Sequence, residues 1–218
     1  MEKEEGKYFY CTIMSSEKKR FGKIGMENNE VYTIPHRDIA AVVSDSPMID
    51  YELSEDNTRR HEEVIRQVMN EYSVLPTEFG TVIKNKIILK RLLKKAYEPT
   101  KDGLKMVDSM VELGVKAVQS EENVFADAEK RREYAQDILE SLKPASKQTA
   151  VGDLFSRRLI LNASFLVNKD RVDAFSDEVE KLQFKYPTLK FLYSGPWAPH
   201  NFVYIKIGGD GVEIKRNR

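Results

Sequence analysis

The segment Leu159–Tyr186 reads LILNASFLVNKDRVDAFSDEVEKLQFKY and carries the two clearest structural patterns of the chain. Its first part, Leu159–Val167, is rich in apolar residues and predicts the strongest strand. Asp170 can cap the helix that follows. The apolar positions of that helix recur every three or four residues and predict a core-facing stripe, formed by Val172, Phe175, Val179, Leu182 and Tyr186. This pattern indicates helices laid on one face of a sheet.

The rest of the second half supplies further elements. Val111–Gln119 predicts a strand, and residues 121–143 predict a charged helix with a thin apolar seam. Such a helix either lies solvated on the surface or docks on another chain. Apolar residues within Ala150–Phe155 predict one more short helix. The last predicted strands are Leu189–Ser194 and Phe202–Ile207, and a glycine-rich, charged tail follows them.

In the first half, residues 8–83 predict the order β–loop–β–β–α–β. This is a ferredoxin-like order in which a loop replaces the first helix. Two helical segments, Lys86–Ala96 and another that starts near Pro99, connect the halves. The predicted strands are Tyr8–Ser15, Val31–Ile34, Asp38–Ser44 and Val74–Pro76, and the predicted helix is Asp56–Tyr72.

We therefore predict an α+β fold with two modified ferredoxin-like α/β-sandwich domains joined by helices and followed by a short C-terminal tail. The expected boundaries are residues 1–84 for the N-terminal domain, 85–110 for the connecting helices, 111–207 for the C-terminal domain and 208–218 for a flexible tail. A chain of 218 residues is long enough to build two such cores.

Composition narrows the class of protein. Hydrophobic residues make up 41% and charged residues 32%, as in globular proteins. Lys and Arg together number 35, as do Asp and Glu, so the chain lacks the basic excess typical of nucleic-acid binding. No apolar run approaches the roughly 20 residues of a membrane span. The single cysteine, Cys11, is expected to be buried and fits a reducing cytosol. We expect a cytoplasmic protein that binds neither nucleic acid nor lipid membrane.

The residue types that usually carry chemistry are few and scattered. Three histidines, His36, His61 and His200, show no zinc-ligand spacing, and the chain has no Walker A, G-x-S-x-G or H-E-x-x-H motif. His61 lies at the edge of an apolar helix stripe, which favours a packed or capping histidine; catalysis would need a partner base or nucleophile. The pair Glu62-Glu63 is expected to be solvated. We expect no catalytic, cofactor-binding or metal-binding residues, and no enzyme.

Four motifs occur in a fixed order along the chain. HEEVI (His61–Ile65) precedes VLPTEFGTV (Val74–Val82), and LILNASFLVNKDRVDAF (Leu159–Phe175) precedes SGPWAPHNF (Ser194–Phe202). In this combination nearly the whole chain resembles the gas vesicle protein F / protein L family. The motif residues are expected to be structural or to contribute to an interaction: His61, Leu75, Pro76, Phe79, Gly80, Gly195, Pro196, Trp197, Pro199 and Phe202.

The last motif predicts a stiff corner between two strands. Gly195 can adopt a positive φ, and prolines restrict the residues that precede them. Trp197 is expected to pack over the C-terminal core, with a partner for its N–H. The motif departs from the family pattern because Ala198 replaces a proline and His200 stands at a tyrosine position. His200 is therefore expected to be a tolerated ring rather than a catalyst.

The resemblance implies an accessory or minor structural protein of gas vesicles, of the F or the L type, with two ferredoxin-like domains. It implies binding to the hydrophobic main shell protein and to other accessory proteins, either as a chaperone or as a shell-bound component. Such binding would aid ordered assembly or prevent aggregation, through a sheet edge or an exposed helix face. The alternative is a small-molecule-binding regulatory module with ferredoxin-like domains.

Overall fold

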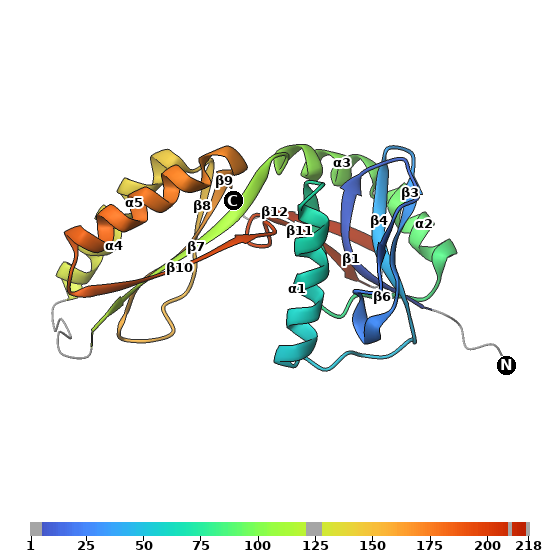
Figure 1. Ribbon diagram of the computed structural model, residues 1–218, viewed down its shortest axis with the longest axis horizontal. Helices are drawn as coiled ribbons and strands as arrows, with labels where there is room; N and C mark the ends of the chain where they lie inside the picture. The colour runs from blue at the N-terminus through green and yellow to red at the C-terminus, as the bar shows by residue number, and fades with distance from the viewer. Residues whose placement is uncertain (1–5, 121–127, 209–210, 217–218) are drawn as a thin grey trace. The chain divides into compact units, whose positions relative to one another are not determined.

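The computed structural model describes residues 6–120, 128–208 and 211–216, which divide into two compact units. The first unit contains the described residues up to Asp108 together with Ala198–Arg216, and the second contains Ser109–Trp197. Each unit combines helices with antiparallel strands (Figure 1). The fold is therefore mixed α and β, as the alternation of patterns along the sequence predicts.

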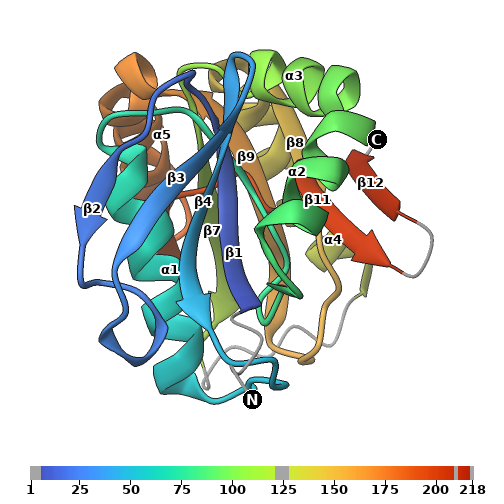
Figure 2. The ribbon, with the colours of Figure 1, turned by 90° about the vertical axis from the view of Figure 1, so that its right-hand side faces the viewer.

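The first unit is built on a sheet with the strand order β2-β3-β4-β1-β5, in which β6 also pairs with β1. Helix α1 lies on one side of this sheet, and α2 and α3 lie on the other (Figure 2). The strands are β1 (Gly6–Met14), β2 (Arg20–Gly22), β3 (Val31–His36), β4 (Ile39–Ser46), β5 (Val74–Pro76) and β6 (Val82–Ile83). The helices are α1 (Glu55–Met69), α2 (Lys86–Lys95) and α3 (Tyr97–Met106).

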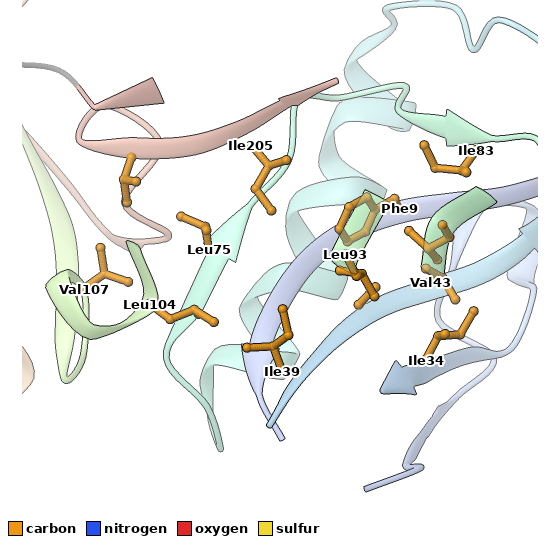
Figure 3. Close-up of a cluster of buried hydrophobic side chains, with 13 residues drawn as sticks. Phe9, Ile34, Ile39, Val43, Leu75, Ile83, Leu93, Leu104, Val107 and Ile205 are labelled. Carbon is orange, nitrogen blue, oxygen red and sulfur yellow. The ribbon is translucent and has the colours of Figure 1, made fainter. Parts of the chain in front are cut away.

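Strand β1 is buried on both faces because helices cover both sides of the sheet. Phe9 points into a cluster of thirteen buried hydrophobic side chains that includes residues of β4, α2 and α3 (Figure 3). Tyr8 and Tyr10 lie on the other face, towards His61 of α1. Cys11 is also fully buried, as predicted. Burial of large apolar side chains at about 1.5–3 kcal/mol each makes this strand the centre of the unit's stability.

The two final strands, β11 (Val203–Gly208) and β12 (Gly211–Arg216), pair with each other and belong to the first unit. Val203 and Ile205 are part of the same buried cluster as Leu75, and Ile205 forms a parallel bridge to Thr77 (Figure 3). The prediction that residues 111–207 form one domain is therefore wrong for the last ten of them. Residues 211–216 of the predicted flexible tail form strand β12, while residues 209–210 and 217–218 lie outside the described part.

The second unit has a four-stranded sheet in the order β10-β7-β9-β8. Helices α4 and α5 both lie on one face of it (Figure 1). The predicted stripe of α5 is confirmed at Phe175, Val179 and Leu182, which are buried. The strands are β7 (Met110–Gln119), β8 (Gln148–Val151), β9 (Leu159–Asn168) and β10 (Leu189–Trp197), and the helices are α4 (Ala128–Leu142) and α5 (Val172–Lys185). Residues 121–127 of the predicted charged helix lie outside the described part.

Two local predictions in this unit are wrong. Residues 150–155 do not form a helix: Ala150 pairs with Ser164 in the β8–β9 ladder, and the N–H of Gly152 donates to the carbonyl of Asn162 at 2.8 Å. A short apolar run fits both helical and strand spacing, so its long-range pairing decides. Asp170 is not the cap of α5, because the N-cap position is Arg171 and no side chain caps it. Asp170 lies instead in a 3-10 turn (Lys169–Arg171), where its N–H donates to the side chain of Asn168.

Candidate functional site

Three of the predicted motif residues, His61, Phe79 and Gly80, meet around Tyr8 in the first unit. Nδ1 of His61 lies 3.1 Å from the Tyr8 hydroxyl, which also accepts a hydrogen bond from the N–H of Gly80 at 2.9 Å. The His61 ring packs edge-on against the rings of Tyr8 and Phe79. A single hydroxyl thus ties together β1, α1 and the loop after β5.

The ionisable groups of this cluster are buried, and their pKa values reflect that. The pKa of His61 is lowered to about 4, mainly by burial, which Glu62 partly opposes and the nearby His200 reinforces. Burial also raises the pKa of Tyr10 to about 12 and raises that of Tyr8. The cluster is therefore neutral at ordinary pH. Because His61 is only 1% exposed, a substrate in solvent cannot reach it, and its contacts are those of a structural hydrogen bond.

The two motif residues before this loop hold strand β5 in place. Leu75 lies in the buried cluster, and Pro76 is paired with Cys11 of β1. The next residue, Thr77, donates two hydrogen bonds to the carbonyl of Tyr10. One comes from its N–H at 3.0 Å and the other from its hydroxyl at 2.9 Å. These contacts fix where the strand ends and where the loop with Phe79 begins.

The last motif is divided between the two units. Gly195, Pro196 and Trp197 end strand β10 of the second unit, whereas Pro199 and Phe202 are buried in the first unit. Gly195 has the predicted positive φ, +122°, and the Gly195–Pro196 peptide bond is cis. The carbonyl of Pro199 accepts hydrogen bonds from the N–H groups of Phe202 and the next residue, each at 3.0 Å. The predicted corner is thus a turn that is closed by hydrogen bonds to the carbonyl of Pro199.

His200 and Glu62 form a contact that the sequence did not predict. Nε2 of His200 lies 3.2 Å from Oε1 of Glu62. Partial burial acts to raise the pKa of Glu62, but His200 and, to a smaller extent, His61 hold it below its usual value. The expectation that Glu62 is solvated is therefore wrong. The one local indication that Glu62 would be partly buried was the core-facing position of its neighbour His61, which places Glu62 beside that face of the helix.

The prediction for Trp197 is also wrong, because this side chain is 42% exposed. Pairing across the sheet places Trp197 beside Glu112 and Leu192 beside Lys116, so all four lie on one face. The ammonium of Lys116 lies 5.2 Å from the ring centroid of Phe155. Phe155, Leu192 and Trp197, which we call the apolar sheet patch, therefore share this face.

The opposite face of the same sheet packs on the helices. Leu113 of β7 pairs with Phe165 of β9, and the Phe165 ring lies 5.1 Å from that of Phe175 in α5. The helices therefore leave the apolar sheet patch uncovered, with Phe155 73% and Leu192 44% exposed. Strand β10 is also an edge strand, because among the described residues it pairs with β7 alone.

Neither unit contains an evident site for a metal among its described residues, since no three His, Cys, Asp or Glu side chains cluster suitably. Within the same residues no helix combines the length and the apolar character of a membrane span.

Comparison with known proteins agrees with this architecture. Residues 6–130 and 125–204 match the family model described as gas vesicle synthesis protein GvpL/GvpF. Gas vesicle protein F1 of Halobacterium salinarum is 33% identical over 184 residues, which cover 83% of this chain and 84% of that protein. Gas vesicle protein F of Haloferax mediterranei is 38% identical over 186 residues, with the same coverage of each chain.

The fold has a counterpart among solved structures. The crystal structure of the gas vesicle protein GvpF from Anabaena superposes with a TM-score of 0.79 at 20% sequence identity. The similarity covers 90% of this chain and 97% of that one, so it extends over both units.

Proposed function

The chain belongs to the gas vesicle synthesis protein GvpL/GvpF family, and from this premise we propose that it binds the hydrophobic main shell protein of gas vesicles. Binding would aid the ordered addition of shell subunits or prevent their aggregation. The physical need is clear, because exposed apolar surface associates at roughly 25 cal/mol per Å² buried. A partner that covers this surface until assembly would keep the subunits apart.

The observation that supports the proposal is the apolar sheet patch on an edge strand. Residues from Leu192 to Trp197 are all exposed, so the free edge of β10 can accept a further strand while Leu192 and Trp197 contact its side chains. Strand addition of this kind derives affinity from main-chain hydrogen bonds and selectivity from alternate side chains. Phe155 extends the same surface towards Lys116.

Other aspects of the proposal follow from the family. We place the protein in the cytoplasm at the gas vesicle, in contact with the shell protein and with other accessory proteins, and acting by binding rather than by catalysis. We also propose that each unit is a modified ferredoxin-like domain. The order β10-β7-β9-β8 and the order β3-β4-β1-β5 both place the first and third strands at the centre, which supports this.

Co-expression of the tagged chain with the main shell protein tests the proposal. We expect the shell protein to co-purify with the wild-type chain and to be lost from a Phe155→Ser/Leu192→Ser variant. Phe184→Ser is the matched control, because Phe184 is 84% exposed but lies on α5. Absence of co-purification with the wild-type chain, together with normal vesicles after deletion of its gene, would contradict the proposal.

A further inference from the structure

A second surface feature lies in the first unit, whereas the apolar sheet patch belongs to the second. A pocket of about 800 Å³ is lined by residues of β3, of the segment before and within β2, and of the N-terminal half of α2. Five of its lining residues are cationic, namely Lys18, Lys19, Arg20, Lys86 and Lys90. In a chain with a formal net charge of zero, this is a local concentration of positive charge.

The two carboxylates in the pocket are already engaged. Nη1 of Arg20 lies 2.6 Å from Oε2 of Glu30. Asp45 pairs with Lys7 outside the pocket and accepts a hydrogen bond from the Tyr32 hydroxyl at 2.6 Å. Neither carboxylate is therefore available to neutralise the remaining cations of the pocket.

Three of the five cations keep their charge unmatched. Lys19 pairs with Glu71 outside the pocket. Within the described residues, Lys18, Lys86 and Lys90 have no carboxylate at ion-pair distance, and all three are exposed. The pocket thus presents three ammonium groups to a bound ligand, one from the segment before β2 and two from α2.

Helix α2 carries its lysines at a cost to its own stability. Its ten residues, KIILKRLLKK, include five cations and no acid. Lys86 occupies the first turn, where the helix dipole disfavours positive charge. The pair Lys86 and Lys90 is spaced i,i+4, and like charges at this spacing cost about 0.2–0.5 kcal/mol. Solubility alone does not require this arrangement, because acids at some of these positions would serve it equally and would stabilise the helix.

The positive charge of α2 also acts on His36, at the end of β3. Burial lowers the pKa of His36, and the next contributions to the lowering come from Arg37, Lys94 and Lys90. Lys90 therefore places positive charge near the end of β3 as well as in the pocket.

We propose that this pocket docks an acidic segment of a partner protein. Three ammonium groups spread over two parts of the fold suit carboxylates spread along a chain. Bidentate phosphate recognition uses an arginine fork, and Arg20, the arginine of the pocket lining, is already paired with Glu30. The first N–H groups of α2 are already capped, because the Asn85 side chain accepts from Ile87 and Ile88 at 3.0 Å each. Pro35, which is half-buried and also lines the pocket, provides contact for an apolar side chain between the acids.

The test is direct binding of a fluorescein-labelled acidic peptide, DELDELDE, to the full-length chain, with NQLNQLNQ as the neutral control peptide. We expect the acidic peptide alone to bind and its affinity to fall as salt rises. In Lys86→Gln/Lys90→Gln the affinity should fall about fivefold to tenfold, since each lost ion pair contributes up to about 1 kcal/mol. Arg91→Gln/Lys94→Gln removes the same charge from α2 outside the pocket lining and should change the affinity less than about twofold.

Three outcomes would overturn the proposal. The acidic peptide does not bind; both double variants weaken binding equally, which would indicate a general field rather than this pocket; or inorganic pyrophosphate displaces the peptide at equal concentration, which would indicate a phosphate site. Circular dichroism of each variant checks that α2 remains folded. Because this pocket and the apolar sheet patch lie in different units, either proposal can fail without the other.

Discussion

Acidification should destabilise the first unit through His61, and the size of the effect follows from its burial. The folded state holds His61 neutral with a pKa of about 4, whereas an unfolded chain has a histidine pKa of about 6.5. Between these values the unfolded state binds the proton and the folded state does not. The free energy of unfolding is therefore highest above pH 6.5 and falls as the pH drops towards 4.

The magnitude can be worked out for an accessible pH. Each unit of pKa difference between the folded and unfolded states corresponds to about 1.4 kcal/mol of unfolding free energy. Full protonation of His61 would therefore lower the unfolding free energy by about 3 kcal/mol. At pH 5 the folded state is still mostly unprotonated, and the expected loss relative to pH 8 is about 2 kcal/mol. Measurement at pH 5 or above also avoids Glu62, whose lowered pKa makes its contribution disappear only in stronger acid.

Urea unfolding at pH 8 and pH 5, followed by circular dichroism, measures this loss, and hydrogen exchange of amides in α1 and β1 assigns it to the first unit. In His61→Gln the loss should shrink by about 2 kcal/mol, because the titrating group is gone. His36→Gln is the matched control: His36 is half-buried, so its removal should change the pH dependence less. If wild type and His61→Gln lose the same free energy between the two pH values, within about 0.5 kcal/mol, the reasoning is refuted.

Four further substitutions test separate contacts by urea unfolding. Tyr8→Phe removes the hydroxyl shared by His61 and Gly80 and should cost about 1–3 kcal/mol, because the partly buried N–H of Gly80 loses its acceptor and buried His61 loses its partner; a neutral result would show that the hydroxyl is dispensable. Gly195→Ala should cost at least about 2 kcal/mol, since it combines a strained positive φ with a Cβ only 2.8 Å from a backbone carbonyl oxygen. Gly80→Ala, with a positive φ but open space, should cost less, and the reverse order would contradict the steric account. Leu75→Ala should leave a cavity and cost about 2–5 kcal/mol; a loss below about 1 kcal/mol would mean that the cluster relaxes around it.

The motif residues explain why the family is recognisable from sequence. His61, Phe79 and Gly80 are held around one hydroxyl, and Gly195 has a backbone conformation that disfavours other residues. These contacts are consistent with the predicted structural role of the motif residues. The surfaces proposed for binding, the apolar sheet patch and the cationic pocket, consist of other residues, and only Trp197 belongs to both groups.

Local pattern was enough to predict most of the elements. The apolar stripe of α5, the doubly buried strand β1 and the strand Leu159–Val167 each depend on side-chain periodicity, which nearby residues alone express. The error at Ala150 has the same origin, because a short apolar run has no unambiguous period and its pairing with Ser164 is a long-range event.

The sequence by itself determined the element types, the family and the absence of recognised catalytic motifs, since these depend on local spacing and composition. Only the tertiary structure decided that Val203 and Ile205 return to the core of the first unit and that His200 meets Glu62. It also decided that Trp197 faces away from the helices. The physical reason is that strand pairing and ion pairing join residues more than a hundred positions apart, and apolar strands of similar composition are equally suited to either core. The space left between the other elements decides which core a strand joins, and the local sequence pattern contains no information about that space.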